Sequence, residues 1–264
     1  MTIKFQNPPI NELIITTYFN PPISNLRNEH IGIFWSRIKE DFPESSQQIP
    51  IGGAEGIVDV NNEISPMPRY WFISKDKINL LQVQKNALML NWRRKETDYP
   101  RFNACLKPAF DKYFSMFSEF VRNHTDTPEL TIDLCQLTYI NVIKSCAFWS
   151  GPQDTQHVIP SFSFPSSRIT SFPPAFNCSY MFDLLPDLQL VVRVRNNVVT
   201  SAESGEAEPV LIMEIQANGR LGKAGKLETD PWFDHAHELI NKCFLEITNP
   251  EIQRQYWKLV EEGQ

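Results

Sequence analysis

The sequence contains no long hydrophobic run. Among its 264 residues the longest uninterrupted apolar stretches, such as Val210–Met213, are only four residues long. A membrane-spanning helix needs about 18 apolar residues or more, so none is expected. The first residues, Met1–Phe5, also lack the apolar core of a secretory signal peptide. We therefore expect a cytoplasmic protein that does not enter a membrane.

Cysteine is sparse, and its spacing excludes two familiar kinds of site. The five cysteines are odd in number and widely separated, and no C-x-x-C pair occurs. Cysteine pairs at fixed spacing are typical of disulfide frameworks and zinc sites. We therefore expect free thiols in a reducing compartment. The cysteines are Cys105, Cys135, Cys146, Cys178 and Cys243.

Recognisable catalytic motifs are missing as well. The sequence has neither the G-x-S-x-G of a nucleophile elbow nor the G-K-[ST] core of a P-loop. The glycine-lysine run Gly219–Lys226 comes nearest to a phosphate-binding loop, and we interpret it as a connector. These absences favour a non-enzymatic protein without a cofactor, and they leave open catalytic groups that only the fold brings together.

The hydrophobic pattern that is present indicates an α+β fold. Tight turns at Lys75-Asp76 and Lys85-Asn86 join three strands into a meander. Meanders combined with later helices favour an antiparallel sheet with helices packed on one face. The predicted strands are Asn11–Phe19, Arg69–Ser74, Lys77–Gln84, Ala87–Arg93, Leu130–Ile143, Phe176–Leu184, Leu188–Asn196 and Val210–Ala217.

Apolar residues at helical spacing, bounded by proline and N-cap residues, predict the helices. A kink or a break is expected at Pro108, and the polar residues 44–68 are predicted to form mostly loop. We expect a single domain over residues 1–264, with two pseudo-repeated halves, 1–127 and 128–264, as the alternative. The predicted helices are Asn28–Phe42, Asp98–Asn123, Asp230–Ile247 and Pro250–Trp257.

Charge is distributed unevenly along the chain. The segment Arg69–Lys107 holds nine basic and three acidic residues, a net charge of +6, whereas the whole chain carries −6 and the remainder therefore −12. In the predicted hairpin the end of the second strand lies beside the start of the first, so basic residues are expected to gather in one patch. This patch is a candidate surface for an acidic partner or a phosphate. Its residues are Arg69, Lys77, Trp92, Arg93 and Arg94, with Lys75 nearby.

A second candidate for anion binding lies in a later strand. Arg193 and Arg195 alternate with valines, so both arginines share one face of the sheet. That face either meets water or lines a polar groove.

Potential metal ligands cluster at the start of the helix predicted from Asp230. Asp234, His237 and Glu238 stand at helical spacings that can bind a metal ion. Acidic residues in a first turn also stabilise a helix by themselves, so a structural role is favoured over a metal site. Asp187 and Glu214 suggest the paired carboxylates of metal-dependent nucleases, but Gln216 stands where such enzymes carry lysine.

Three stretches resemble one known family. They are Val83-Gln84 with Asn91-Trp92-Arg93 and Tyr99-Pro100-Arg101-Phe102, Pro8-Pro9-Ile10 with Glu12, and Leu137–Asn141. Together they are similar to the signature of a sporadically distributed bacterial family of proteins of about this length, whose function is unassigned. The family pattern often has an acidic residue after the aromatic one, whereas Asn103 stands here. The resemblance therefore implies no catalytic residue. Patchy distribution implies horizontally moved genes, and hence accessory roles in defence or toxin–antitoxin loci.

Three functions follow from these observations. The favoured hypothesis is a non-enzymatic accessory or interaction protein that binds a protein partner encoded nearby. A nucleic-acid or nucleotide-phosphate binding protein is the first alternative, although a net charge of −6 repels a polyanion at long range. A metal-dependent hydrolase is the second.

Overall fold

The computed structural model describes residues 3–51, 67–95, 97–163, 175–185, 188–200, 205–220 and 229–261. The chain divides into two compact units. Unit 2 comprises Ile14–Gln136 with Gly219–Thr229. Unit 1 comprises Met1–Leu13, Leu137–Asn218 and Asp230–Gln264. The first residues of the chain therefore belong with its later part, unlike in the halves 1–127 and 128–264.

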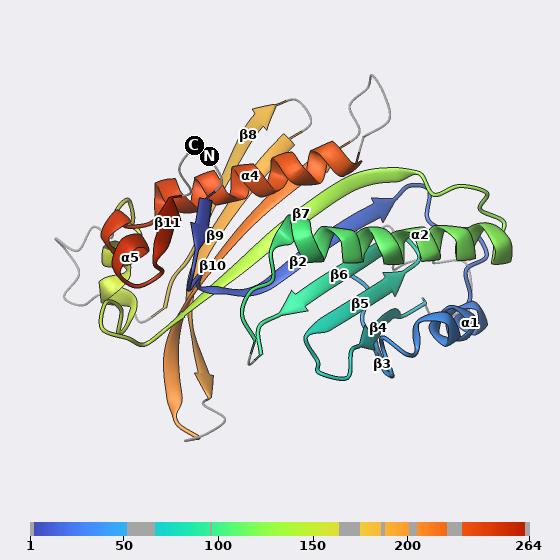
Figure 1. Cartoon of the computed structure of the whole chain (residues 1–264), viewed down its shortest axis with the longest axis horizontal. Coiled ribbons are helices and arrows are strands. Elements are labelled where there is room, and N and C mark those ends of the chain that lie inside the picture. Colours follow the sequence, from blue (N-terminus) through green and yellow to red (C-terminus); the bar gives the residue numbers. More distant parts are fainter. Residues whose placement is uncertain are drawn as a thin grey trace. The chain divides into compact units, whose positions relative to one another are not determined.

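Nine strands form an antiparallel sheet in the order β3-β4-β5-β6-β2-β7-β10-β9-β8, and β1 pairs with β11 in a separate small sheet (Figure 1). The predicted α+β class with an antiparallel sheet is confirmed. The strands are β1 (Ile3–Phe5), β2 (Ile10–Phe19), β3 (Glu44–Gln48), β4 (Arg69–Ile73), β5 (Asn79–Gln84), β6 (Ala87–Arg93), β7 (Ile132–Lys144), β8 (Asn177–Leu185), β9 (Leu188–Thr200), β10 (Ala207–Arg220) and β11 (Leu259–Glu261). The helices are α1 (Asn28–Ile38), α2 (Lys107–His124), α3 (Thr155–Val158), α4 (Thr229–Ile247) and α5 (Pro250–Gln255), with a π-helical turn at Phe102–Leu106 and a 3₁₀ turn at Pro152–Asp154.

The structure differs from the sequence prediction at short or polar elements. Strand β3, with the sequence ESSQQ, lies where a loop was predicted, because it has no apolar alternation to reveal it. The helix predicted from Asp98 begins instead with the π-helical turn, and the regular α-helix starts at Lys107. Pro108 stands at the second position of α2, directly after the π-helical turn, so the type of helix changes next to the proline.

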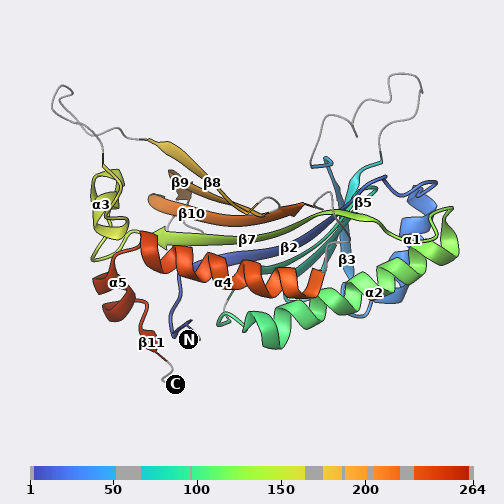
Figure 2. The ribbon, with the colours of Figure 1, turned by 90° about the horizontal axis from the view of Figure 1, so that it is seen from above.

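The core of unit 2 lies between one face of its strands and the helices α1 and α2 (Figure 2). Tyr70 and Phe72 point to this face because they alternate along β4 with half-buried residues. The ring of Phe34 from α1 packs at 6.2 Å from Phe72 and at 5.2 Å from Phe117 of α2. All of these side chains are buried, so the aromatic cluster joins both helices to the sheet.

The core of unit 1 lies beneath α4. Buried residues alternate along β10, and Ile215 meets Ile240 of α4 beside a small cavity. Phe244 of α4 contacts Trp257, with ring centroids 5.0 Å apart, and Phe5 of β1 at 5.4 Å. The small sheet of β1 and β11 is therefore attached to the end of α4.

No helix in the described ranges has the length and apolar character needed to cross a membrane. All five cysteines are free thiols. The cytoplasmic location remains a prediction.

Candidate interaction surface

Strand β8 is the last strand of the nine-stranded sheet. It pairs with β9 in antiparallel register, with Tyr180 opposite Val192 and Phe182 opposite Leu190. In the strand order nothing follows β8, so the backbone groups on its outer side have no neighbouring strand in the described part of the chain. Such an edge is a ready template for pairing with another chain.

The side chains of β8 are unusually apolar for so exposed a strand. Tyr180 is 49% exposed, Met181 62%, Phe182 45% and Leu184 44%. These four residues include most of the large apolar side chains that are exposed in the described part of unit 1. Contiguous exposed apolar patches are uncommon on monomeric proteins and mark interaction sites or aggregation hazards. We refer to Asn177–Leu185 as the β8 edge.

The exposed patch continues a row of apolar side chains that is buried in β9. Leu190 and Val192 of β9 are 5% and 3% exposed, and their register partners Phe182 and Tyr180 lie on the same face of the sheet. The apolar row therefore runs from the interior to the outermost strand, where the aromatic side chains become half exposed.

The β8 edge also lacks the usual protection against pairing. Natural edge strands carry lysine, proline or bulges that discourage association. The β8 edge contains one charged residue, Asp183, and no lysine or proline. An irregularity in its pairing with β9 falls between Asp183 and Leu185, at the very end of the strand. Most of the strand is therefore free to accept a partner.

The basic residues of unit 2 are partly gathered as predicted. The backbone N–H of Arg93 donates to the carbonyl of Ile78 at 2.8 Å, which places Arg93 beside the exposed Lys77. Arg94 follows, half-buried, and burial lowers its pKa although Asp98 opposes the shift. We call Lys75, Lys77, Arg93 and Arg94 the basic end.

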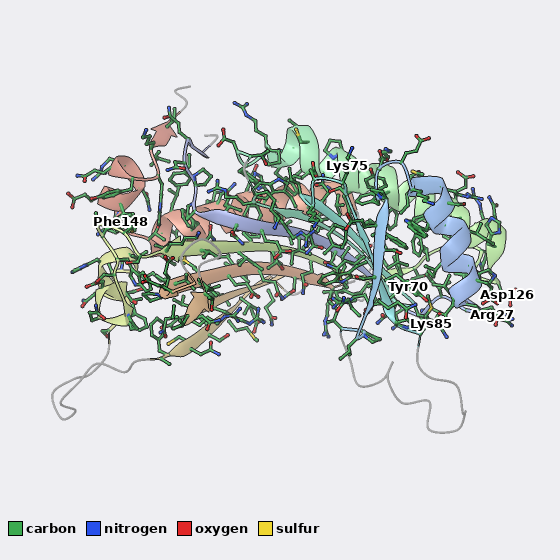
Figure 3. The ribbon with its side chains drawn as sticks, turned by 90° about the horizontal axis from the view of Figure 1, so that it is seen from below. Arg27, Tyr70, Lys75, Lys85, Asp126 and Phe148 are labelled. Atoms are coloured by element: carbon green, nitrogen blue, oxygen red, sulfur yellow. The ribbon has the colours of Figure 1, made fainter. Side chains whose placement is uncertain are left out.

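The prediction that Arg69 joins this patch is wrong. Tyr70 pairs with Val83, so Arg69 lies level with the far end of β5, whereas Arg93 lies level with Ile78. Six residues of strand separate these levels, or about 20 Å. Figure 3 shows the same distinction, with Lys75 and Lys85 beside opposite ends of β5. In a three-strand meander the first and third strands run in the same direction, so both begin at the same end of the sheet. Arg69 is the first residue of β4 and Arg93 is the last residue of β6, so the two lie at opposite ends.

Trp92 does not form part of the surface. Its side chain is 2% exposed and packs edge-on against Tyr99, with ring centroids 5.3 Å apart. It pairs with Asn79 in the register of β5 and β6 and belongs to the core. Trp92 therefore offers no ring on which a base or a partner side chain could stack.

Arg69 instead belongs to a polar network that the sequence analysis missed. Its guanidinium donates to Oε1 of Gln82 at 2.9 Å and lies 5.4 Å from the centre of the Trp71 ring. Trp71 donates to the same oxygen at 2.9 Å, and Gln82 donates to Asn91 at 2.6 Å. Burial lowers the pKa of Arg69, and the charge interaction with Tyr18 opposes this shift. In the sequence, only the two-residue spacing of Arg69 and Trp71 indicates that both side chains lie on the same face of β4.

Arg193 is also engaged within the fold. It forms an ion pair with Glu214 and donates to Gln216 at 3.0 Å. Arg195 lies on the same face of β9, as predicted from the alternation, and is half-buried. Because Glu214 neutralises Arg193, this face offers an anion less charge than the sequence suggested. Asp187 and residues 221–226 of the glycine-lysine run lie outside the described residues.

His237 has a structural environment. Its Nδ1 lies 2.6 Å from the hydroxyl of Tyr139, and the Asn241 amide nitrogen lies 3.1 Å from its Nε2. Burial lowers the pKa of His237 to about 4, although Asp234 and Glu238 both oppose the shift. Within the described ranges no three histidine, cysteine or acidic side chains gather to hold a metal ion.

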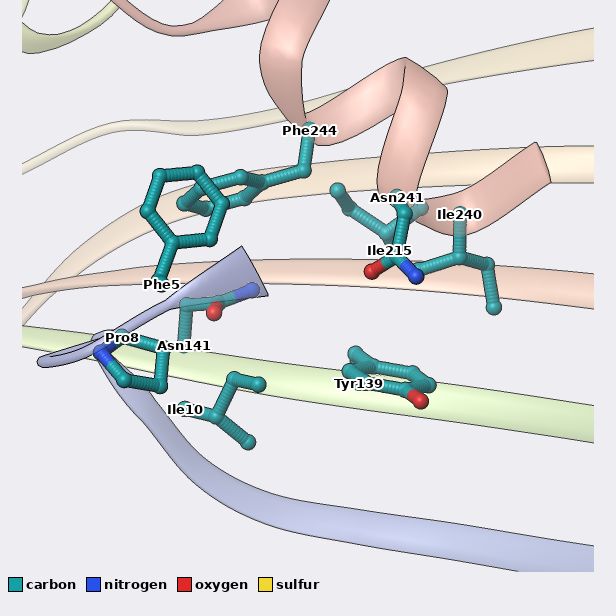
Figure 4. A pocket seen from close by; sticks show the side chains of 9 residues that line it. All are labelled: Phe5, Pro8, Ile10, Tyr139, Asn141, Ile215, Ile240, Asn241 and Phe244. Atoms are coloured by element: carbon teal, nitrogen blue, oxygen red, sulfur yellow. The ribbon is translucent and has the colours of Figure 1, made fainter. Parts of the chain in front are cut away.

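A cavity of about 20 Å³ lies beside this histidine, between β1, β7 and α4 (Figure 4). Tyr139, Asn141 and Asn241 contribute polar groups to its wall, and the other lining residues are apolar. A space of this size holds about one water molecule. It is therefore too small for a substrate.

Unit 2 contains a larger and more open groove, of about 680 Å³. Two of its carboxylates are held by neighbours: Asp41 accepts from Lys112 at 2.8 Å and from Tyr113 at 2.9 Å. Asp76 accepts from Ser74 and from a backbone N–H within its own turn. These bonds lower the pKa of both carboxyls, which makes them structural anchors of the groove wall.

The sequence matches no protein-family model and no curated protein. The family resemblance therefore remains a prediction.

Proposed function

We propose that this chain is a non-enzymatic interaction protein that binds another polypeptide along the β8 edge. The observation that carries the proposal is the exposure of four apolar residues on the outermost strand of the sheet. These residues are Tyr180, Met181, Phe182 and Leu184. In this mode an extended partner segment adds a strand to the sheet. Backbone hydrogen bonds supply affinity, and side chains on the two faces supply specificity.

The side-chain contribution has a definite scale. Tyr180 and Phe182 each expose about half of their surface, together roughly 200 Å². Covering that area contributes about 5 kcal/mol at about 25 cal/mol per Å². Association itself costs about 4–15 kcal/mol. The aromatic pair therefore does not hold a partner alone, and the backbone ladder with Met181 and Leu184 must contribute as well.

The family resemblance supports an accessory role within this proposal. Patchy distribution favours a protein that acts with products of the same mobile locus, in defence or in a toxin–antitoxin pair. The proposal therefore includes a partner encoded nearby, and the chain serves as a binding subunit.

Co-expression of the tagged chain with its flanking genes and with an untagged copy of itself tests the proposal. We expect the wild-type protein to retain a polypeptide, and the Tyr180→Lys/Phe182→Lys variant to lose it, because two ammonium groups cannot be buried in an apolar row. Ile49→Lys is the matched control: it changes an apolar residue that is 81% exposed and belongs to unit 2, whereas β8 belongs to unit 1. Retention that is equal in all three proteins would refute the β8 edge as the binding site. Circular dichroism confirms that the variants are folded.

Nucleic-acid or nucleotide-phosphate binding is the second candidate, supported by the basic end. Arg93 and Arg94 remain beside Lys77. Burial of Trp92 removes the stacking platform that single-strand binding commonly uses. Oligonucleotide binding in a salt series decides this alternative: affinity that falls steeply with salt, and that is lost in Arg93→Glu/Arg94→Glu, would favour it.

A further inference from the structure

We infer that the polypeptide that occupies the β8 edge is a second copy of this chain, paired antiparallel about Met181. This inference rests on the proposed function, because it names the partner of the same surface. The two β8 strands would join the two sheets edge to edge around a two-fold axis, the commonest symmetry of soluble homo-oligomers.

The sequence of β8 is self-complementary about its centre. Met181 is the middle residue of Asn177–Leu185, so a two-fold axis there pairs all nine residues, and any shift along the strand leaves residues without partners. Tyr180 then stands opposite Phe182 of the second copy. Aromatic pairs across antiparallel strands are among the stabilising ones. Cys178 stands opposite Leu184, which is again an apolar pairing.

The single charge of the strand is placed favourably in this register. Asp183 stands opposite Ser179, whose hydroxyl can donate to the carboxylate. A register that brought Asp183 against its own copy would set like charges opposite one another, which destabilises a strand pair. Because the strand has no cation, nothing in it selects an acidic partner by charge.

The apolar row of unit 1 becomes continuous in the same register. A two-fold axis perpendicular to the sheet keeps the covered faces of both copies on one side. Within each copy Phe182 lies opposite Leu190, and Tyr180 lies opposite Val192. Across the dimer the row therefore reads Leu190 and Phe182 of one copy, then Tyr180 and Val192 of the other. Rings that are half exposed in one copy are thereby enclosed by the two copies together.

Sedimentation velocity of the full chain at roughly 1–100 μM, the range expected of small interfaces, tests this inference. We expect a dimer for the wild type and for Ile49→Lys, and a monomer for Tyr180→Lys/Phe182→Lys. Each copy carries a net charge of −6, so salt should weaken the repulsion between copies and strengthen the dimer.

A cysteine pair tests the register itself. In a background in which the exposed Cys105 and Cys146 are replaced by serine, Met181→Cys places two thiols across the axis. Opposed residues have Cα atoms about 4.5–5.5 Å apart, which suits a disulfide. Ser179→Cys is the matched control, because its two copies lie four residues apart, about 13 Å.

We expect mild oxidation to link the Met181→Cys protein into a covalent dimer and to leave Ser179→Cys unlinked. If the protein is a monomer that binds a neighbour-encoded protein through β8, the inference that the partner is a second copy is overturned, and the proposed function stands. A dimer that survives Tyr180→Lys/Phe182→Lys would also overturn this inference. A monomer that binds nothing through β8 would overturn both.

Discussion

His237 should make the folded state less stable as the pH falls from 7 to 5. Burial holds its pKa at about 4 in the folded protein, whereas the value for the free side chain is 6.5. The unfolded chain therefore takes up a proton first, and the free energy of unfolding decreases as the pH drops through 6.5. The contribution is fully present above 6.5 and is lost as the pH approaches 4.

The size of the effect follows from the two values. A difference of one pKa unit corresponds to about 1.4 kcal/mol, so complete titration removes about 3 kcal/mol. At pH 5, between the two values, the loss is about 2 kcal/mol. The carboxyls of Asp41, Asp76 and Asp154, whose pKa values are lowered by hydrogen bonds, lose their contributions only toward pH 4 and below. The interval from pH 7 to 5 therefore isolates the histidine.

Urea unfolding at pH 7, 6 and 5 measures this directly, with His237→Gln as the comparison. We expect the wild type to lose about 2 kcal/mol of unfolding free energy more than the variant between pH 7 and 5. The variant is expected to be less stable at pH 7, because it alters the partners of Tyr139 and Asn241. Equal pH slopes for the two proteins would refute the buried, neutral state of His237.

Other predictions concern the core, a helix cap and the thiols. Phe117→Ala should lower the unfolding free energy by about 3–5 kcal/mol, and Phe117→Leu by less, because the ring is fully buried; a loss below about 1 kcal/mol in chemical denaturation would contradict this packing. Asn249→Ala should cost about 1 kcal/mol, since the side chain accepts a hydrogen bond at 2.8 Å from the backbone N–H of Glu251, the second residue of α5, and an unchanged midpoint would argue against the cap. Cys105 and Cys146 should react with a thiol reagent in the folded protein, whereas Cys135, whose pKa burial raises to about 12, should react only on unfolding; labelling of Cys135 at the rate of the exposed thiols would disprove its burial.

Local patterns in the sequence were sufficient for the regular elements. The hairpin of β5 and β6 and strand β8 were each predicted to within about two residues, because alternation and turn residues act over short distances. Strand β3 was missed because its five residues are polar, and β1 and β11 because three residues carry no period.

The candidate surface was much harder to predict. That β8 ends the sheet depends on strand order, which connects segments far apart in the chain and leaves no local mark. Trp92 was a candidate for the basic patch, with a place in the core as the alternative, and its side chain in β6 is buried. Arg193 and Glu214 lie on different strands, so their ion pair became visible only in the folded chain.

The pairing of β1 with β11 sets an order of events during synthesis. The residues of β1 leave the ribosome some 250 positions before those of β11, and at roughly 5–20 residues per second their partner emerges roughly 10–50 seconds later. Unit 2, by contrast, draws most of its residues from the continuous stretch Ile14–Gln136. Its strands can therefore pair while most of unit 1 is still to be made. During that time β1 stays without its partner strand, until β11 has been synthesised.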